Sequence, residues 1–269
     1  MSGKIEEDPT SKKLLASHKE TVRTSALDIV LRTLPQKLVS LEKMLKTDPR
    51  LNRKCEEIDA VFRKDLAEAR KKVAEAQEKE KEKKKKEKEE EEESAAPAVP
   101  KKRKRDEKEE DDEDKVSDSQ MTMPSNQLIL ETTEILRQEL LAMVSNVDTV
   151  KLWIQLNVPR IEDGNNFGVG VQEDMVSELS RAEDHAFALL ESITKYYIGR
   201  AKLVTRCFKY PKLPDFEMAI SETDQKQYLS NVLSLVDLRN NYALLYDMII
   251  KNIDKLENPR GSEHMSHLF

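Results

Sequence analysis

Apolar residues recur at helical spacing through four long stretches, and this pattern limits the chain to folds built from packed helices. The stretches run from Ser11 to Asp48, from Asn126 to Asn157, from Val171 to Phe208, and from the SETD segment at 221–224 to Leu256. Apolar side chains spaced three and four residues apart lie on one face of a helix. Few glycines and many Leu, Glu and Lys residues favour helix over sheet.

The breaks between the stretches predict how the helices are connected. Pro35 lies inside the first stretch and predicts a kink or a local irregularity. Pro159 ends the second, Ser221 and Asp224 match a capping box at the start of the fourth, and Pro259 helps to stop it. Short connections between the later helices predict antiparallel neighbours. The sequence therefore predicts an all-α subunit, an antiparallel four-helix bundle.

A charged segment interrupts this pattern after the first stretch. Residues Glu78 to Glu93 are sixteen charged residues without a break, so the segment buries nothing and packing cannot offset its ordering entropy. It either extends as a lone charged helix or stays solvated. We expect an N-terminal helical region at 1–70, a charged and disordered insert at 71–125, and the remaining bundle helices at 126–269.

A basic cluster lies in the second half of the insert, with five consecutive residues: Lys101, Lys102, Arg103, Lys104 and Arg105. Such a cluster in a polar linker predicts a nuclear localisation signal, and chance clustering in a solvated linker is the alternative. The acidic residues EEDDED follow closely and the net charge is −6, so nucleic-acid binding is disfavoured.

The remaining features exclude several classes of protein. The charged N-terminus lacks an apolar signal core, and no window of 18 uninterrupted apolar residues is present, so we expect a soluble intracellular protein without a membrane span. Cys55 and Cys207 lie far apart and indicate unpaired thiols. Four histidines form no metal-binding motif, and no cofactor motif appears. A hydrolase using Glu162 and Asp163 has little support, and the chain reads as a non-enzyme.

Three of the six glycines fall within seven residues of the segment PRIEDGNNFGVG, which starts at Pro159. Glycine and asparagine permit backbone angles that other residues resist. We expect Phe167 to anchor this loop on its own bundle. The segment is longer than the 2–8 residues typical of bundle connectors. Its composition indicates a contact surface, with an ordinary connector as the alternative.

The segment WIQLNVPRIEDGNNFGVGVQED resembles the activation loop of the REG-type (11S) proteasome activators. The resemblance extends through TKYYIGRAKLVTRCFKYP and LRNNYALLYDMIIKNIDKLENPRG, and the N-terminal LPQKLVSLEKML is similar to the first helix of the family. It covers essentially everything except the charged insert, which some family members also carry. The third helix is most similar to the gamma branch.

This resemblance implies a ring of seven copies of a four-helix subunit around a pore. It implies that C-terminal tails dock between the alpha subunits of the proteasome core particle, and that activation loops hold the substrate gate open without ATP and without catalysis. Peptides or unfolded proteins would pass through the pore. The gamma branch implies a homoheptamer located in the nucleus, with the cytoplasm as a further location. A nuclear helical scaffold or a chromatin-associated protein is the competing hypothesis.

The resemblance also assigns residues. Asn165 ranks first as a gate contact, and Lys202 matches a position directed toward the channel. Phe269 stands where family tails commonly end in tyrosine, so it lacks that hydroxyl. The tail expected at 259–269 binds through His267, Leu268 and Phe269. The activation loop, expected at 158–170, comprises Arg160, Ile161, Glu162, Asp163, Gly164, Asn165, Asn166, Phe167 and Gly168.

Overall fold

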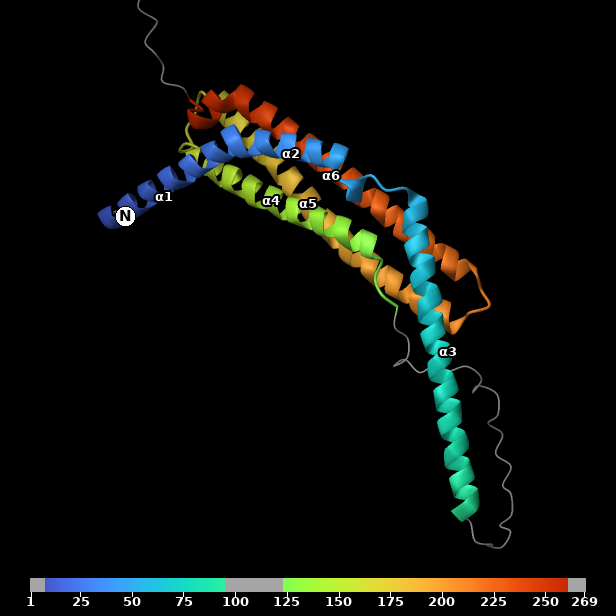
Figure 1. Ribbon diagram of the computed structural model, residues 1–269. Coiled ribbons are helices and arrows are strands. Elements are labelled where there is room, and N and C mark those ends of the chain that lie inside the picture. The colour runs from blue at the N-terminus through green and yellow to red at the C-terminus, as the bar shows by residue number, and fades with distance from the viewer. Residues whose placement is uncertain (1–7, 95–122, 261–269) are drawn as a thin grey trace, which may run out of the picture. The chain divides into compact units, whose positions relative to one another are not determined.

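The computed structural model describes residues 8–94 and 123–260, and all regular structure in these residues is helical (Figure 1). Side chains at 84 and 87–94 are not described. The all-α prediction is therefore confirmed. The elements are α1 (Pro9–Asp28), the π-helical η1 (Ile29–Thr33), α2 (Leu34–Thr47), the 3-10 helix η2 (Pro49–Leu51), α3 (Cys55–Ser94), α4 (Gln127–Asn157), α5 (Phe167–Lys209) and α6 (Asp215–Glu257).

The chain divides into two compact units. The first comprises residues 1–52, 131–195 and 229–269, and the second comprises 53–130 and 196–228. The first unit therefore holds α1, α2, most of α4, the start of α5 and the end of α6. The second holds α3, the end of α5 and the start of α6.

The core of the first unit comes from the predicted apolar stripes. Trp153 and Tyr242 are its largest fully buried side chains, from α4 and α6. Aliphatic residues fill the space around such large groups at the density of an organic crystal. The other large buried side chains of this unit include Leu41, Leu136, Leu140, Met143, Ile154 and Leu179.

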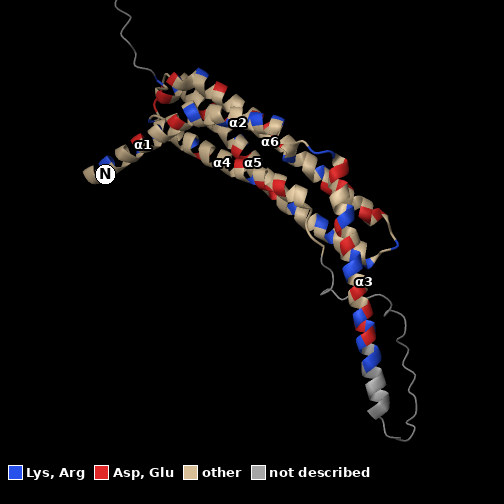
Figure 2. Cartoon of the chain, in the orientation of Figure 1, with Lys and Arg blue, Asp and Glu red and all other residues tan. Residues whose placement is uncertain are grey.

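The second unit has its own apolar cluster, formed by the first turns of α3 with the end of α5 and the start of α6. The buried members are Phe62, Leu66, Ala69, Val73, Cys207, Phe208 and Ile220. The boundary expected at residue 70 falls inside α3, and Val73 still belongs to the cluster. Beyond it, α3 carries basic and acidic side chains on successive turns (Figure 2).

A buried polar network fastens the same three segments of the second unit to one another. Asp224 of α6 is fully buried, and its Oδ1 accepts from Arg200 Nε and from the Tyr196 hydroxyl, both at 2.9 Å. Asn126 Nδ2 donates to Asp224 Oδ2 at 3.3 Å and to the Ile58 carbonyl at 3.2 Å. Burial, together with the Asp224 charge, raises the pKa of the Tyr196 phenol above its ordinary value.

Pro35 produces the local irregularity that its position predicts. Proline has no backbone N–H, so a regular helix loses a hydrogen bond at this residue. The chain passes through the π-helical turn η1, where the Leu34 amide donates to the Ile29 carbonyl five residues earlier. Pro35 then occupies the first turn of α2, where a missing donor is tolerated.

The predicted capping box at Ser221 and Asp224 is wrong, because α6 begins at Asp215. The Pro214 carbonyl accepts from the Glu217 amide at 3.0 Å and starts the helix there. Ser221 and Asp224 lie inside α6 and are buried. Ser221 donates to Asp59 Oδ1 at 2.5 Å, so both residues make tertiary hydrogen bonds and neither caps the helix.

Two kinds of feature are absent from the residues that the structure describes. None of the helices in 8–94 and 123–260 has a window apolar enough to cross a bilayer. Within the same ranges no three His, Cys, Asp or Glu side chains lie close enough to hold a metal ion.

Candidate functional site

The candidate site is the loop at 158–166 that joins α4 to α5 in the first unit. Helix α4 ends at Asn157, and Pro159 prevents its continuation. Helix α5 begins at Phe167, four residues before the expected start at Val171. The loop predicted at 158–170 is therefore shorter, and Phe167 and Gly168 belong to the first turn of α5. The Asn166 carbonyl accepts from the Gly170 amide at 3.0 Å, which fixes this helix start.

The three clustered glycines have different roles. Gly164 has φ 115°, a conformation that side chains with a Cβ rarely adopt, and it turns the loop. Gly168 is helical and buried, and a Cβ atom there would lie 1.9 Å from the Pro259 carbonyl oxygen. Gly170 has open space around the position of a Cβ. Glycine is needed at 164 because of its backbone conformation, and at 168 because Pro259, just after α6, leaves no room for a side chain.

One residue just after α6 holds most of the loop contacts. Arg260 Nη1 donates to Glu162 Oε2 at 2.9 Å, and Nη2 donates to the Arg160 carbonyl at 2.7 Å. Glu162 Oε1 also accepts from Arg160 Nη2 at 2.6 Å. A planar guanidinium suits two acceptors at once. The loop is therefore attached to the chain that follows α6 (Figure 1).

The two asparagines also bond to the backbone. Asn165 Nδ2 donates to the Arg260 carbonyl at 3.3 Å, and Asn166 Nδ2 donates to the Glu162 carbonyl at 3.4 Å. Both bonds are long, and both residues are exposed. Asn165 is thus near the surface while it touches the end of α6.

Apolar side chains project from both sides of this loop. Ile161 is 98% exposed and Phe167 is 76% exposed. The prediction that Phe167 anchors the loop on its own subunit is wrong, because the first turn of α5 directs it outward. Two exposed apolar side chains thus lie close to the polar residues of the loop.

Two residues that the sequence did not indicate also support the loop. Gln172 is buried and its Nε2 donates to the Leu256 carbonyl at 2.9 Å, next to the contact between Gly168 and Pro259. Arg260 was not singled out either. Their contacts with the loop and with α6 join residues 84 to 100 positions apart, so no local sequence pattern indicates them.

Several predicted site residues lie elsewhere. The tail residues His267, Leu268 and Phe269 and the basic cluster at 101–105 lie outside the described residues, so their roles stay predictions. Lys202 is an exposed residue of α5, and its position toward a channel also stays a prediction.

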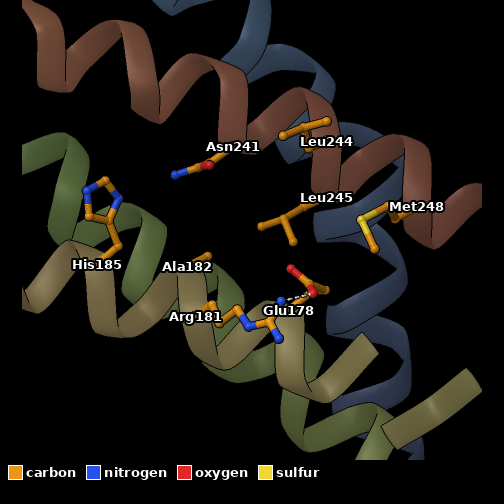
Figure 3. Close-up of a pocket in the computed structure, with 8 residues that line it drawn as sticks. All are labelled: Glu178, Arg181, Ala182, His185, Asn241, Leu244, Leu245 and Met248. Atoms are coloured by element: carbon orange, nitrogen blue, oxygen red, sulfur yellow. Dashed lines mark hydrogen bonds and ion pairs between the residues drawn. The ribbon is translucent and has the colours of Figure 1, made fainter. Parts of the chain in front are cut away.

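The loop is poorly suited to catalysis. Both oxygens of Glu162 already accept hydrogen bonds from arginine side chains, Oε1 from Arg160 and Oε2 from Arg260. A groove of about 160 Å³ between α5 and α6 has no loop residue in its lining (Figure 3). Its polar groups include a Glu178–Arg181 ion pair and His185, and apolar residues Leu244, Leu245 and Met248 complete the lining. The hydrolase hypothesis gains nothing from either place.

Comparison with known sequences finds the family. The family model described as "Proteasome activator PA28, C-terminal" matches residues 122–266. Proteasome activator complex subunit 3 of Homo sapiens is 46% identical over 140 residues, which are 52% of this chain and 55% of that protein. Proteasome activator 28 of Dictyostelium discoideum is 37% identical over 136 residues, 51% of this chain and 60% of that protein. The chain thus spans about half the length of the curated relatives it matches.

Comparison with solved structures extends over nearly the whole chain. The 11S subunit of the Plasmodium falciparum proteasome, PA28, aligns with TM-score 0.65 and 28% identity, covering 97% of this chain and 99% of that one. The P26 activator complex with an archaeal 20S proteasome aligns with TM-score 0.55 and 12% identity, covering 96% and 99%, and shows the fold alone. Since the family model matches more than half of the residues, the chain belongs to the proteasome activator PA28 family.

Proposed function

We propose that this chain is a non-catalytic activator of the proteasome core particle. Copies of it form a seven-membered ring, dock through tails that include His267, Leu268 and Phe269, and open the substrate gate with the 158–166 loop. No nucleotide is consumed, and peptides or unfolded chains pass through the pore. The observation that carries the proposal is the exposed loop, fastened to the end of α6, in a member of this family.

The form of the loop supports a role in contact. Ile161 and Phe167 expose apolar surface, and Asn165 offers an exposed amide close to them. The gate would be biased by contacts that the open state makes and the closed state lacks. A shift from 1:99 to 99:1 needs about 5.5 kcal/mol. One hydrogen bond contributes about 1 kcal/mol, so several loops must act on the same gate.

Assembly with further copies is supported by α1. Every side chain from Pro9 to Thr21 is exposed, including Leu14 at 68% and Leu15 at 52%. Most of the stability of a helix in a protein comes from packing of its apolar face, which these residues lack within their own chain. We infer that another copy of the chain covers this segment in the ring. The tails of seven copies would then bind the core together with an avidity that one weak tail lacks.

We propose that the basic residues 101–105 direct the activator to the nucleus. Five consecutive positive charges in a polar segment suit capture by an import receptor. Fluorescence microscopy of the tagged chain checks this, with alanine at all five positions as the comparison. An unchanged nuclear signal in that variant would contradict the assignment.

The experiment that tests the proposed function is hydrolysis of short fluorogenic peptides by purified proteasome core. Three chains are compared: the intact chain, Asn165→Tyr, and a chain without Leu268 and Phe269. Asn240→Tyr, on an exposed position of α6, is the matched control for a new tyrosine.

We expect strong stimulation by the intact chain and by the control, and loss of stimulation in the other two. Native mass spectrometry first confirms that each chain forms a ring. An assembled intact ring that gives no stimulation would refute the proposal. A salt-sensitive complex with DNA in its place would support the nuclear scaffold.

A further inference from the structure

Arg260 is bonded to the loop at three different residues. Its guanidinium reaches Glu162 Oε2 at 2.9 Å and the Arg160 carbonyl at 2.7 Å, and its own carbonyl accepts from Asn165 Nδ2 at 3.3 Å. The Arg260 side chain is 27% exposed, so these bonds are partly shielded from water. The same residue directly precedes the segment 261–269, which contains the proposed docking tail.

The residues that precede Arg260 are firmly attached to α5. Pro259 is buried against Gly168, at a distance that leaves no room for a side chain. One turn further along α5, Gln172 donates to the Leu256 carbonyl inside the protein. These contacts hold the end of α6 and the start of α5 together. A displacement of Arg260 is therefore transmitted to the loop and is not absorbed by sliding of the helices.

The loop has few other attachments. The ion pair between Arg160 and Glu162 lies within the loop, and the bond from Asn166 to Glu162 is local as well. In the part of the chain that the structure describes, the hydrogen bonds that tie residues 160–165 to another element all involve Arg260. Without it, Gly164 leaves the loop free to take other conformations.

We propose that Arg260 is a positioning residue that couples docking of the tail to placement of the loop. This inference rests on the proposed function and specifies how its two contact regions communicate. When residues after 260 are held by the core, Arg260 is held too, and it fixes Arg160, Glu162 and Asn165 in the orientation that meets the gate. Coupling of this kind is reciprocal, so contact of the loop also favours the docked tail.

Arginine is required for this role because its two terminal nitrogens serve two acceptors in one plane. Lysine keeps the charge, but its single ammonium on a flexible stem cannot hold both acceptors in the same geometry. We therefore compare Arg260→Gln and Arg260→Lys. Arg181→Gln is the matched control, since it removes the same group from an exposed α5 pair with Glu178.

The first measurement is peptide hydrolysis by proteasome core as a function of activator concentration. For Arg260→Gln we expect the maximal stimulation to fall about fivefold or more, as loss of about 1 kcal/mol of loop placement implies. The concentration that gives half-maximal stimulation should change much less. Arg260→Lys should fall between Arg260→Gln and the intact chain, and Arg181→Gln should match the intact chain.

The second measurement needs no core particle. A spin label is attached at Ile161→Cys, a loop position whose side chain is 98% exposed, in a Cys55→Ser chain in which Cys207 stays buried. Arg260→Gln should increase the mobility of this label. The same label at Leu244→Cys on α6 should not respond.

Three results would overturn the inference. Unchanged label mobility in Arg260→Gln would show that Arg260 does not position the loop. Increased mobility with full maximal stimulation would show that loop placement is not coupled to opening. A half-maximal concentration that rises while the maximum is kept would make Arg260 part of the docking tail. Absence of stimulation by the intact chain would refute the proposed function, and the spin label would still decide whether Arg260 positions the loop.

Discussion

Two polar clusters differ in burial: one connects α5 with α6, and the other connects the 158–166 loop with the residues that follow α6. In the second unit, Asp224 is fully buried and Arg200 is 6% exposed, with Tyr196 and Asn126 completing the network. In the first unit, Glu162 is 46% exposed and Arg260 is 27% exposed. A buried charge without its partner is very costly, whereas a pair in water contributes little. The buried cluster therefore stabilises the fold, and the exposed one is free to serve contact with a partner.

The largest loss of stability is expected for Asp224→Ala. This change leaves the Arg200 guanidinium buried without its carboxylate and removes the acceptor of the Tyr196 hydroxyl. The free energy of unfolding should fall by about 3–5 kcal/mol. Urea denaturation at fixed protein concentration measures it, with Asp247→Ala, from the exposed pair with Lys251, as control. A loss below about 1 kcal/mol, the value typical of exposed pairs, would remove the distinction between the clusters.

Gly168→Ala should have the next largest effect, on both stability and function. The added Cβ would lie 1.9 Å from the Pro259 carbonyl oxygen, so the end of α6 must shift. Such overpacking costs about 1–3 kcal/mol. We also expect weaker stimulation of the proteasome core, because Arg260 moves with Pro259.

Gly170→Ala is the matched control for that change. It has open space at the Cβ position in the same helix. Alanine is a better helix former than glycine, so the free energy of unfolding should rise by about 0.5–1 kcal/mol. Thermal unfolding of the two variants side by side checks the opposite signs. Equal destabilisation by both would contradict the close approach of α6.

Ile161→Ser should separate function from stability. Its side chain is 98% exposed, so the free energy of unfolding should change by less than about 0.5 kcal/mol. Stimulation of the core should nevertheless fall, because the apolar contact with the gate is lost. Leu244→Ser, an exposed position of α6, serves as the control for loss of apolar surface. Equal stimulation by Ile161→Ser and the intact chain would leave the loop tip without a role.

The smallest expected effect is a difference in reaction rate between the two thiols. Cys55 is exposed and Cys207 is buried in the second unit. Burial raises the pKa of the Cys207 thiol, even though Arg70 opposes the shift, so less of the reactive thiolate forms at pH 8. With a disulfide reagent we expect one fast thiol in the folded chain and two in urea. Two fast-reacting thiols in the folded chain would show that Cys207, and with it the apolar cluster of the second unit, is open to solvent.

Much of the fold follows from patterns that sequence alone displays. Helical spacing predicted α4 almost to the residue, because its ends are marked by loop residues before Asn126 and by Pro159. Pro35 predicted an irregularity because the missing N–H acts locally, whatever the tertiary context. Features set by the backbone of a few neighbouring residues are the ones that were predicted correctly.

The predictions were wrong where contacts between distant residues, and not the local sequence, determine the structure. Ser221 and Asp224 have the spacing of a capping box, but their side chains satisfy buried partners from other elements. Gly168 was taken for a loop residue because glycine permits unusual backbone angles and the family resemblance includes it in the loop, yet it is helical and close contact with Pro259 explains it. The Arg260 contacts join residues about 100 positions apart, and no local pattern could reveal them.

The most direct test of the account is a competition between the intact chain and Asn165→Tyr on purified proteasome core. If the tail docks and the loop opens, the variant occupies the core without opening it. Increasing amounts of preassembled Asn165→Tyr rings should then reduce peptide hydrolysis stimulated by the intact chain, down to the level of the core alone. If stimulation is unaffected while the variant forms rings, docking and opening are not divided between tail and loop, and the central claim fails.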